Sequence, residues 1–211
     1  MVDFVSKSEN QGSGGLISNA DISDKVVAIG ASTGGTEAIH SIIAALPREM
    51  PGILVVQHMP PVFTELYAQR LNNSCELEVK EAKNGDEVKP GRVLIAAGDY
   101  HMRLAKSNMG YFVKCFRGEK VNGHCPSVDV LFNSVAEVAR DKAVGIILTG
   151  MGSDGAKGIL NMRKKGAFTI GQDEKSSVVY GMPMAAYNMG GVIKQLPLDN
   201  IAKELLNYLS L

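Results

Sequence analysis

Apolar, β-branched runs alternate with segments of helical period along the chain from Lys25 onward. This alternation is typical of βαβ units, in which strands buried on both faces form a parallel sheet covered by helices. The sequence therefore predicts an α/β protein with a mostly parallel sheet flanked by helices. Strands are expected at residues 25–30, 52–57, 77–80, 92–97, 111–116, 144–149, 167–171 and 191–194.

The segments between these runs carry apolar residues at the spacing of one helix face. Two of them show the pattern i, i+3, i+4, i+7, beginning at Ile39 and at Val128. A C-terminal segment places Ile201, Leu205 and Leu209 on one face. These positions predict amphipathic helices that pack on the sheet.

Residues 77–125 show no clear helical period. Turn signals at residues 84–86, 90–91 and 108–110 separate short apolar runs there instead. Glycine beside Asn, Asp or Pro is the usual composition of tight turns between strands. We therefore expect antiparallel hairpins inserted into the parallel scheme.

The first 24 residues differ from the rest in composition. They are rich in Ser, Gly, Asn and Asp, and Gly12-Ser13-Gly14-Gly15 lies in their middle. We expect residues 1–24 to be a flexible linker or tail and residues 25–211 to be one folded domain. A chain of 211 residues with 45% hydrophobic and 21% charged residues is ordinary for a soluble globular protein.

Charge and cysteine content exclude several classes of protein. Lys and Arg number 22, as do Asp and Glu, and no basic run offers a surface for nucleic acid. The three cysteines lie in no C-x-x-C pair, which argues against a disulfide framework or a cysteine zinc site and favours the cytoplasm. The first residues do not show the pattern of a signal peptide, and no apolar run approaches roughly 20 residues. We therefore expect neither secretion by that route nor a membrane span.

Three of the predicted strands end in chemically useful side chains. The first leads into Gly30-Ala31-Ser32-Thr33-Gly34-Gly35, the second ends at Gln57-His58, and a later one ends in Gly150-Met151-Gly152-Ser153-Asp154-Gly155. Ligands of open α/β sheets bind outside the carboxyl ends of the strands. We therefore expect the hydroxyl of Ser32, the imidazole of His58 and the carboxylate of Asp154 to meet at one edge.

These three groups have the chemistry of a nucleophile, a base and an orienting acid. A serine hydroxyl becomes reactive when an imidazole takes its proton and a carboxylate fixes the imidazole tautomer. Such a triad predicts contacts near ~3 Å from Ser32 Oγ to His58 Nε2 and from His58 Nδ1 to Asp154. Backbone N–H groups of Thr33 and Met151 are candidates for stabilising an oxyanion.

Simpler roles and a different chain order keep the sequence interpretation open. Gly30, Ser32 and Gly34 match G-x-S-x-G, but the order Ser, His, Asp differs from the Ser, Asp, His order of α/β-hydrolases. Ser32 and Asp154 could instead cap helices, and His58 could be a structural histidine at a strand end.

A second interpretation concerns the loop Gly150–Gly155. It reads G-x-G-x-x-G between a predicted strand and a predicted helix, and Asp173-Glu174 follow at about the spacing of a ribose-binding acid. This pattern predicts a Rossmann-type NAD site. Against it, the Asp154 carboxylate would stand where a pyrophosphate must bind.

Five ordered motifs carry a resemblance to a known family. VVAIGASTGG, VVQHMP, PSVDVLF, ILTGMGSDGAKG and VVYGMP, within residues 25–195, resemble the catalytic domain of chemotaxis protein-glutamate methylesterases. The resemblance implies a doubly wound α/β sheet and a serine hydrolase that needs no metal or other cofactor. It assigns Ser32 as nucleophile, His58 as general base and Asp154 as its partner, with Thr33 and Met151 in matching active-site positions.

The resemblance also implies a substrate and partners. Members remove methyl esters from glutamates of methyl-accepting chemoreceptors and deamidate certain glutamines, so the expected partner is the cytoplasmic helical bundle of a receptor. The enzyme would be cytoplasmic, near the membrane only through the receptor. Members usually carry a phosphorylatable receiver domain, for which residues 1–24 are too short, so we expect an isolated catalytic domain or a stand-alone member.

The segment HCPSVDV supplies the candidates for the substrate entrance. His124, Ser127 and Asp129 are expected to line it, together with Pro126. The alternative is that this segment is simply a helix N-terminus, since Pro126 and Ser127 are common start signals.

Overall fold

A seven-stranded parallel sheet forms the centre of the protein in the computed structural model, which describes residue 22 and residues 24–211. The predicted tail at residues 1–24 lies almost entirely outside the described residues. The strand order is β3-β4-β2-β1-β7-β8-β9, with every neighbouring pair parallel. The strands are β1 (Val26–Ala31), β2 (Gly52–Gln57), β3 (Glu78–Glu81), β4 (Arg92–Ile95), β7 (Ala143–Ile147), β8 (Phe168–Gln172) and β9 (Lys194–Leu196).

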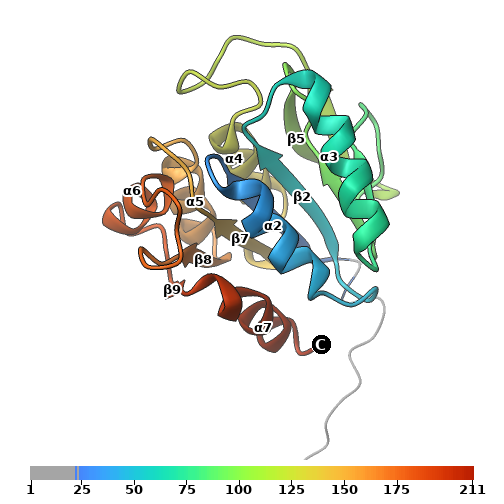
Figure 1. Cartoon of the computed structure of the whole chain (residues 1–211). Helices are drawn as coiled ribbons and strands as arrows, with labels where there is room; N and C mark the ends of the chain where they lie inside the picture. The colour runs from blue at the N-terminus through green and yellow to red at the C-terminus, as the bar shows by residue number, and fades with distance from the viewer. Residues whose placement is uncertain (1–21, 23) are drawn as a thin grey trace, which may run out of the picture.

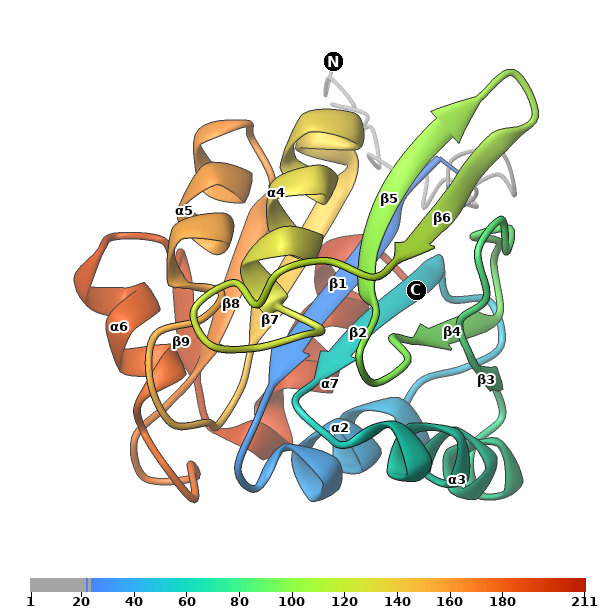
Figure 2. The same cartoon turned by 90° about the horizontal axis from the view of Figure 1, so that it is seen from above.

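Helices cover both faces of the sheet (Figures 1 and 2). One face carries α2 (Gly35–Ala44), α3 (Pro61–Ser74) and α7 (Leu198–Leu209). The other carries α4 (Val128–Val138), α5 (Ala156–Lys164) and α6 (Met182–Asn188), and a short 3-10 helix η1 (Arg140–Lys142) follows α4. The predicted doubly wound α/β architecture is therefore confirmed.

The alternation of side chains along β1 explains why this strand is apolar throughout. Val26 and Ala28 belong to the core cluster under α4 and α5, whereas Val27 and Ile29 belong to the cluster under α2, α3 and α7. Successive strand residues point to opposite faces, so a strand covered on both sides needs an apolar residue at every position. All six residues of β1 are buried, and so are all six of β2.

The region expected to contain several hairpins contains one antiparallel pair. Strands β5 (His101–Ser107) and β6 (Gly110–Phe116) form a two-stranded hairpin around the predicted turn at residues 108–110. The prediction was wrong for β3 and β4, which pair in parallel within the main sheet. Turns at residues 84–86 and 90–91 thus belong to a crossover, and glycine and proline mark a turn without fixing the direction of the next strand.

The carboxyl ends of β2, β1 and β7 lie side by side at one edge of the sheet (Figure 2). After β1 the chain enters α2 on one face, and after β7 it enters α5 on the other face. The strand order reverses here, which is the position where open α/β sheets bind ligands. No helix in the described part of the chain is long and apolar enough to cross a membrane.

Candidate active site

Ser32 lies on a tight turn between β1 and α2. Its backbone N–H donates to Thr149 O at 3.0 Å, and its carbonyl accepts from Gly35 N at 2.8 Å and from Gln57 Nε2 at 2.9 Å. The residue is half-buried, and its Oγ has no hydrogen-bond partner among residues 22 and 24–211. The turn is therefore fixed through its backbone while the hydroxyl stays free.

Glycines allow other segments to approach this turn closely. Gly34 has φ 79°, a left-handed conformation that glycine adopts without strain. A Cβ on Gly150 would lie 2.7 Å from Ser32 Cβ, and one on Gly35 would lie 2.1 Å from Gln57 Oε1. The glycine pattern thus brings the loop after β7 against the serine and leaves room for Gln57.

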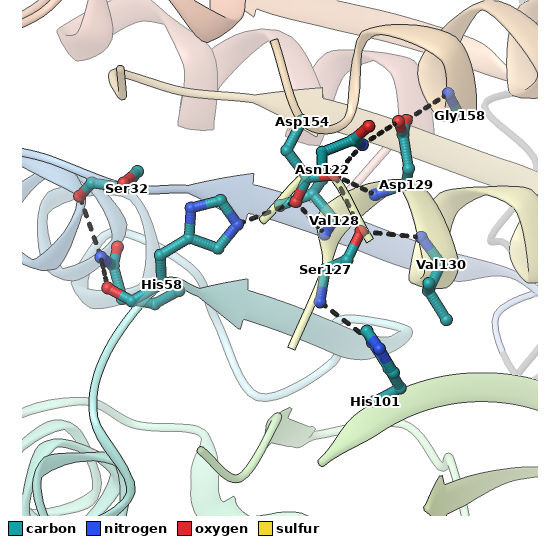
Figure 3. A network of polar contacts seen from close by, with 11 residues as sticks. Ser32, His58, His101, Asn122, Ser127, Val128, Asp129, Val130, Asp154 and Gly158 are labelled. Atoms are coloured by element: carbon teal, nitrogen blue, oxygen red, sulfur yellow. Dashed lines mark hydrogen bonds and ion pairs between the residues drawn. The ribbon is translucent and has the colours of Figure 1, made fainter. Parts of the chain in front are cut away.

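His58 follows β2 and lies between Ser32 and Asp154 (Figure 3). Its Nε2 is 2.8 Å from Asp154 Oδ2, and its side chain is 8% exposed. Its Nδ1 is buried and has no hydrogen-bond partner in the described part of the chain. The ionised carboxylate can only accept, so Nε2 carries the proton and Nδ1 has a free lone pair.

The expected order of the two ring nitrogens was wrong. The sequence interpretation placed Nε2 toward Ser32 and Nδ1 toward Asp154, but Nε2 contacts Asp154. No hydrogen bond joins Ser32 Oγ and His58 within the residues that the structure describes. His58 and Asp154 follow β2 and β7, the strands on either side of β1, and the imidazole reaches across the end of β1 with its distal nitrogen toward the carboxylate.

Asp154 is 1% exposed, yet its carboxylate is saturated with donors. Burial alone would raise its pKa, but this is outweighed by hydrogen bonds to the ionised form, and the pKa falls to about 2. The carboxylate is therefore ionised at neutral pH. Its donors are His58 Nε2, Asn122 Nδ2, Ser127 Oγ and the backbone N–H groups of Val128 and Asp129.

Asp154 and Asp129 bind each other's helices: each carboxylate accepts backbone N–H groups at the N-terminus of the helix next to the other residue. Asp154 precedes α5 but accepts backbone N–H groups at the start of α4, at 2.7 Å from Val128 and 3.2 Å from Asp129. Asp129, in the first turn of α4, accepts Gly158 N of α5 at 2.7 Å. Burial raises the pKa of Asp129, and its hydrogen bonds only partly offset this. Each carboxylate thus stabilises the N-terminus of the other residue's helix.

This arrangement overturns the dinucleotide interpretation of the loop Gly150–Gly155. A pyrophosphate would need the free N-terminus of α5, but the Asp129 carboxylate already binds Gly158 N there. The proposed ribose-binding acid, Asp173, instead accepts hydrogen bonds from the backbone N–H and the hydroxyl of Ser176. We find no arrangement that fits NAD at this loop.

The expected entrance residues divide into two groups. Ser127 and Asp129 are 0% and 4% exposed and bind Asp154 or α5, so they lie beneath the site and the expectation was wrong for both. Ser127 is also the N-cap of α4, as the alternative interpretation predicted. His124 and Pro126 line a cleft of about 270 Å³ together with His58.

Thr33 and Met151 lie at the open side of the site. Both are exposed, the Met151 side chain with 67% of its surface. Neither backbone N–H has an intramolecular acceptor within residues 22 and 24–211. Thr33 directly precedes the N-cap of α2, Gly34, so its N–H lies at the positive end of a helix. No group of three His, Cys, Asp or Glu side chains suited to a metal occurs in the described residues.

Two contributors to the site were missed in the sequence. Gln57 holds the backbone on both sides of the site, because its Nε2 donates to Ser32 O and to His58 O. Asn122 donates to both buried carboxylates, Asp129 and Asp154, at 2.8 Å each. The pair Asn122-Gly123 was the available signal, since Asn-Gly strongly favours a two-residue turn.

Comparisons with known proteins identify the relatives of this chain. The family model described as CheB methylesterase matches residues 27–205. A protein-glutamate methylesterase/protein-glutamine glutaminase from Syntrophomonas wolfei is 60% identical over 185 residues, covering 88% of this chain and 54% of that protein. One from Escherichia coli O157:H7 is 53% identical over 188 residues, covering 89% and 54%.

A solved structure matches as well. The catalytic domain of Thermotoga maritima CheB methylesterase superposes with a TM-score of 0.85 and 42% sequence identity, covering 87% of this chain and 98% of that one. The chain spans about half the length of the curated relatives it matches. The match of the family model extends from β1 into α7 and includes Ser32, His58 and Asp154. The chain therefore belongs to the CheB methylesterase family.

Proposed function

We propose that the protein is a serine hydrolase that removes methyl esters from glutamate side chains of methyl-accepting chemoreceptors and deamidates receptor glutamines. The observation that carries this proposal is the His58 imidazole, bound to the ionised Asp154 carboxylate at 2.8 Å and lying beside the Ser32 hydroxyl, which has no partner among the described residues. The family relationship supports the same chemistry, since its similar members are named for both activities.

In this mechanism Ser32 Oγ attacks the γ-carbonyl carbon while His58 Nδ1 takes the hydroxyl proton. The C–O bond to the methoxy group then breaks, and the same proton leaves with methanol. Water then attacks the acyl carbon and gives a proton to Nδ1, the bond from that carbon to Ser32 Oγ breaks, and Nδ1 returns the proton to Oγ. The glutamate side chain leaves as the acid and ionises, so the second proton of water passes to the solvent. With a glutamine substrate, ammonia leaves in place of methanol.

Asp154 acts through His58. Its carboxylate holds the Nε2–H tautomer, so the lone pair of Nδ1 is available to the serine, and it stabilises the imidazolium that forms. No hydrogen bond joins the Ser32 hydroxyl and His58 Nδ1 in the structure, and such contacts often tighten only in the reacting complex. Backbone N–H groups of Thr33 and Met151 are the donors we assign to the oxyanion, each typically worth about 2.7–4 kcal/mol.

The surroundings of the site suit a substrate on a protein surface. His58 opens onto the cleft of about 270 Å³, rather than onto an enclosed chamber. We propose the cytoplasmic helical bundle of a chemoreceptor as partner, a cytoplasmic location, and no cofactor or nucleic acid. The relatives' greater length is compatible with control by a receiver domain in a longer protein.

The experiment is release of methanol from methylated receptor fragments. The wild-type chain should release methanol, and Ser32→Ala should abolish it. Ser107→Ala, at the last residue of β5 beside the hairpin turn, should retain full activity. Methanol release by Ser32→Ala at the wild-type rate would refute the proposal. Micromolar binding of NAD(H) would revive the dinucleotide alternative, and we expect none.

A further inference from the structure

A two-residue turn lies beside the His58–Asp154 pair. Val121 and His124 exchange backbone hydrogen bonds of 3.0 Å in both directions, and Asn122 and Gly123 form the turn between them. Both central residues have positive φ, at 51° and 82°. This is the type I′ geometry that Asn-Gly favours, so the turn is defined by its own sequence.

One side chain of the turn binds the carboxylates. Asn122 Nδ2 lies 2.8 Å from Asp129 Oδ2 and 2.8 Å from Asp154 Oδ1, so its two N–H groups bridge the acids (Figure 3). Asn122 is itself exposed, whereas Asp129 and Asp154 are 4% and 1% exposed. The amide therefore satisfies two buried anions from the solvent side and fixes the distance between them.

A second side chain of the turn covers the imidazole. The rings of His124 and His58 are stacked, with centroids 3.7 Å apart and planes at 8°. Burial, followed by the charge of His58, lowers the pKa of His124, so this ring stays neutral at neutral pH. A neutral stacked ring limits rotation of His58 without repelling the imidazolium that catalysis forms.

The segment that carries the turn is tied at both ends by one buried histidine. His101, which is 2% exposed, contacts Glu119 O through Nε2 at 2.9 Å and accepts Ser127 N through Nδ1 at 3.2 Å. Residues 119–127 thus form a loop whose base is held by β5. The other charged groups near the cleft are Lys120 and Asp99.

We propose that this 119–127 loop positions the general base. Asn122 and His124 are positioning residues that fix the Asp154 carboxylate and the His58 imidazole relative to each other. Asn122 acts through the carboxylate and His124 through the imidazole face. This inference rests on the proposed function, because it assigns the loop to the base of that reaction. It predicts effects on turnover rather than on substrate binding.

The test compares two pairs of variants. Asn122→Gly keeps the turn, since glycine tolerates positive φ, and removes both hydrogen bonds. It should lower kcat by roughly 10- to 100-fold with KM changed less than about 3-fold. His124→Ala should lower kcat about 10-fold, and His124→Phe, which restores a stacked ring, should recover it to within about 3-fold. Asn84→Gly and His40→Ala are matched controls away from the site and should leave kcat unchanged.

A spectroscopic measurement separates this inference from the proposed function. The low-field proton signal of His58 Nε2–H should broaden in Asn122→Gly and in His124→Ala, but not in the controls. Wild-type kcat and an unchanged signal in both variants would refute the inference while leaving a Ser32-dependent hydrolase intact. If the wild type showed no Ser32-dependent hydrolysis, the proposed function would fail, and the proton signal would still report whether the loop holds His58. Should Asn122→Gly fail to fold, His124→Ala and His124→Phe decide the inference.

Discussion

Ser32 and Asp154 follow adjacent strands, β1 and β7, but their side chains have opposite surroundings. Five donors bind the Asp154 carboxylate, and it is almost completely buried. The Ser32 hydroxyl is half-buried and has no partner among the described residues. The imidazole of His58 lies between these two environments, with Nε2 bound to Asp154 and Nδ1 without a partner in the described part of the chain.

This difference shows how one candidate site can combine a rigid carboxylate with an accessible hydroxyl. The carboxylate side is part of the packing of α4 on α5, because Asp154 also binds the N-terminus of α4. Among the described residues, the serine side is held through its backbone and the hydroxyl has no partner, so it can bond to substrate or base. Changes on the carboxylate side should therefore affect stability and activity together, and changes at the hydroxyl should affect activity alone.

Asp154→Asn should have the largest effect. An amide cannot accept from all five donors, so at least one buried donor loses its partner and the imidazole tautomer is no longer fixed. We expect kcat to fall about 10⁴-fold and the free energy of unfolding to fall by about 2–4 kcal/mol. Turnover assays and urea denaturation measure the two effects.

Two control variants are compared with Asp154→Asn. Asp199→Asn, at an exposed position in the first turn of α7, should change the free energy of unfolding by less than about 0.5 kcal/mol. Ser32→Ala should be inactive with wild-type stability. An Asp154→Asn protein as stable as the wild type would contradict the structural role of the carboxylate.

Gly150→Ala should have the next largest effect. The new Cβ would lie 2.7 Å from Ser32 Cβ and 2.4 Å from Met182 Sδ. Met182 can move its flexible end, but the serine turn must shift, and a displacement near 1 Å costs about 10²-fold in kcat. Recovery of kcat by adding Met182→Ala would show that the clash with Met182, rather than with Ser32, caused the loss.

Acid should destabilise the wild-type protein through Asp154. Its pKa is about 2 in the folded protein against a usual value of 3.8, so its ionised form contributes stability above about pH 4. That contribution, of about 2 kcal/mol, is lost as the pH falls toward 2. Unfolding free energies of the wild type and of Asp154→Asn, compared from pH 6 to pH 2, should converge at the acid end. Parallel curves would argue against this assignment.

Met151→Ala should have the smallest effect. The side chain is exposed, and the donor that we assign to the oxyanion is the backbone N–H, which the substitution keeps. We expect kcat within about 3-fold of the wild type and stability within about 0.5 kcal/mol. A loss of about 100-fold would mean that the side chain itself contacts the substrate.

Much of the fold and part of the site could be predicted from local pattern. Strands buried on both faces are apolar at almost every position, as β1 and β2 are apart from Gln57, so continuous apolar runs located them. The rule that parallel strands end at one edge then brought Ser32, His58 and Asp154 together. No local signal fixed the direction of β4 relative to β3, because it depends on how the crossover packs against the sheet.

Other features depend on contacts between side chains that are far apart in the sequence, and no local pattern predicts such contacts. Ser127 and Asp129 look like polar residues of an entrance, but the packing of α4 on α5 buries them. The nitrogen of His58 that meets Asp154 depends on the distance across the end of β1. Asn122 was recognisable as a turn residue, but its two carboxylate partners come from separate elements.

The hydrogen bonds by which Asp154 binds the start of α4 and Asp129 binds the start of α5 have a consequence for redesign of the protein. Position 32 should accept a new reactive group at little cost to folding, because the half-buried Ser32 hydroxyl has no partner among the described residues, so Ser32→Cys is a practical starting point for trapping an acylated form. Position 154 offers no such freedom, because a replacement must also bind the N-terminus of α4. New chemistry should therefore be built from the hydroxyl side, with the carboxylate kept as scaffold.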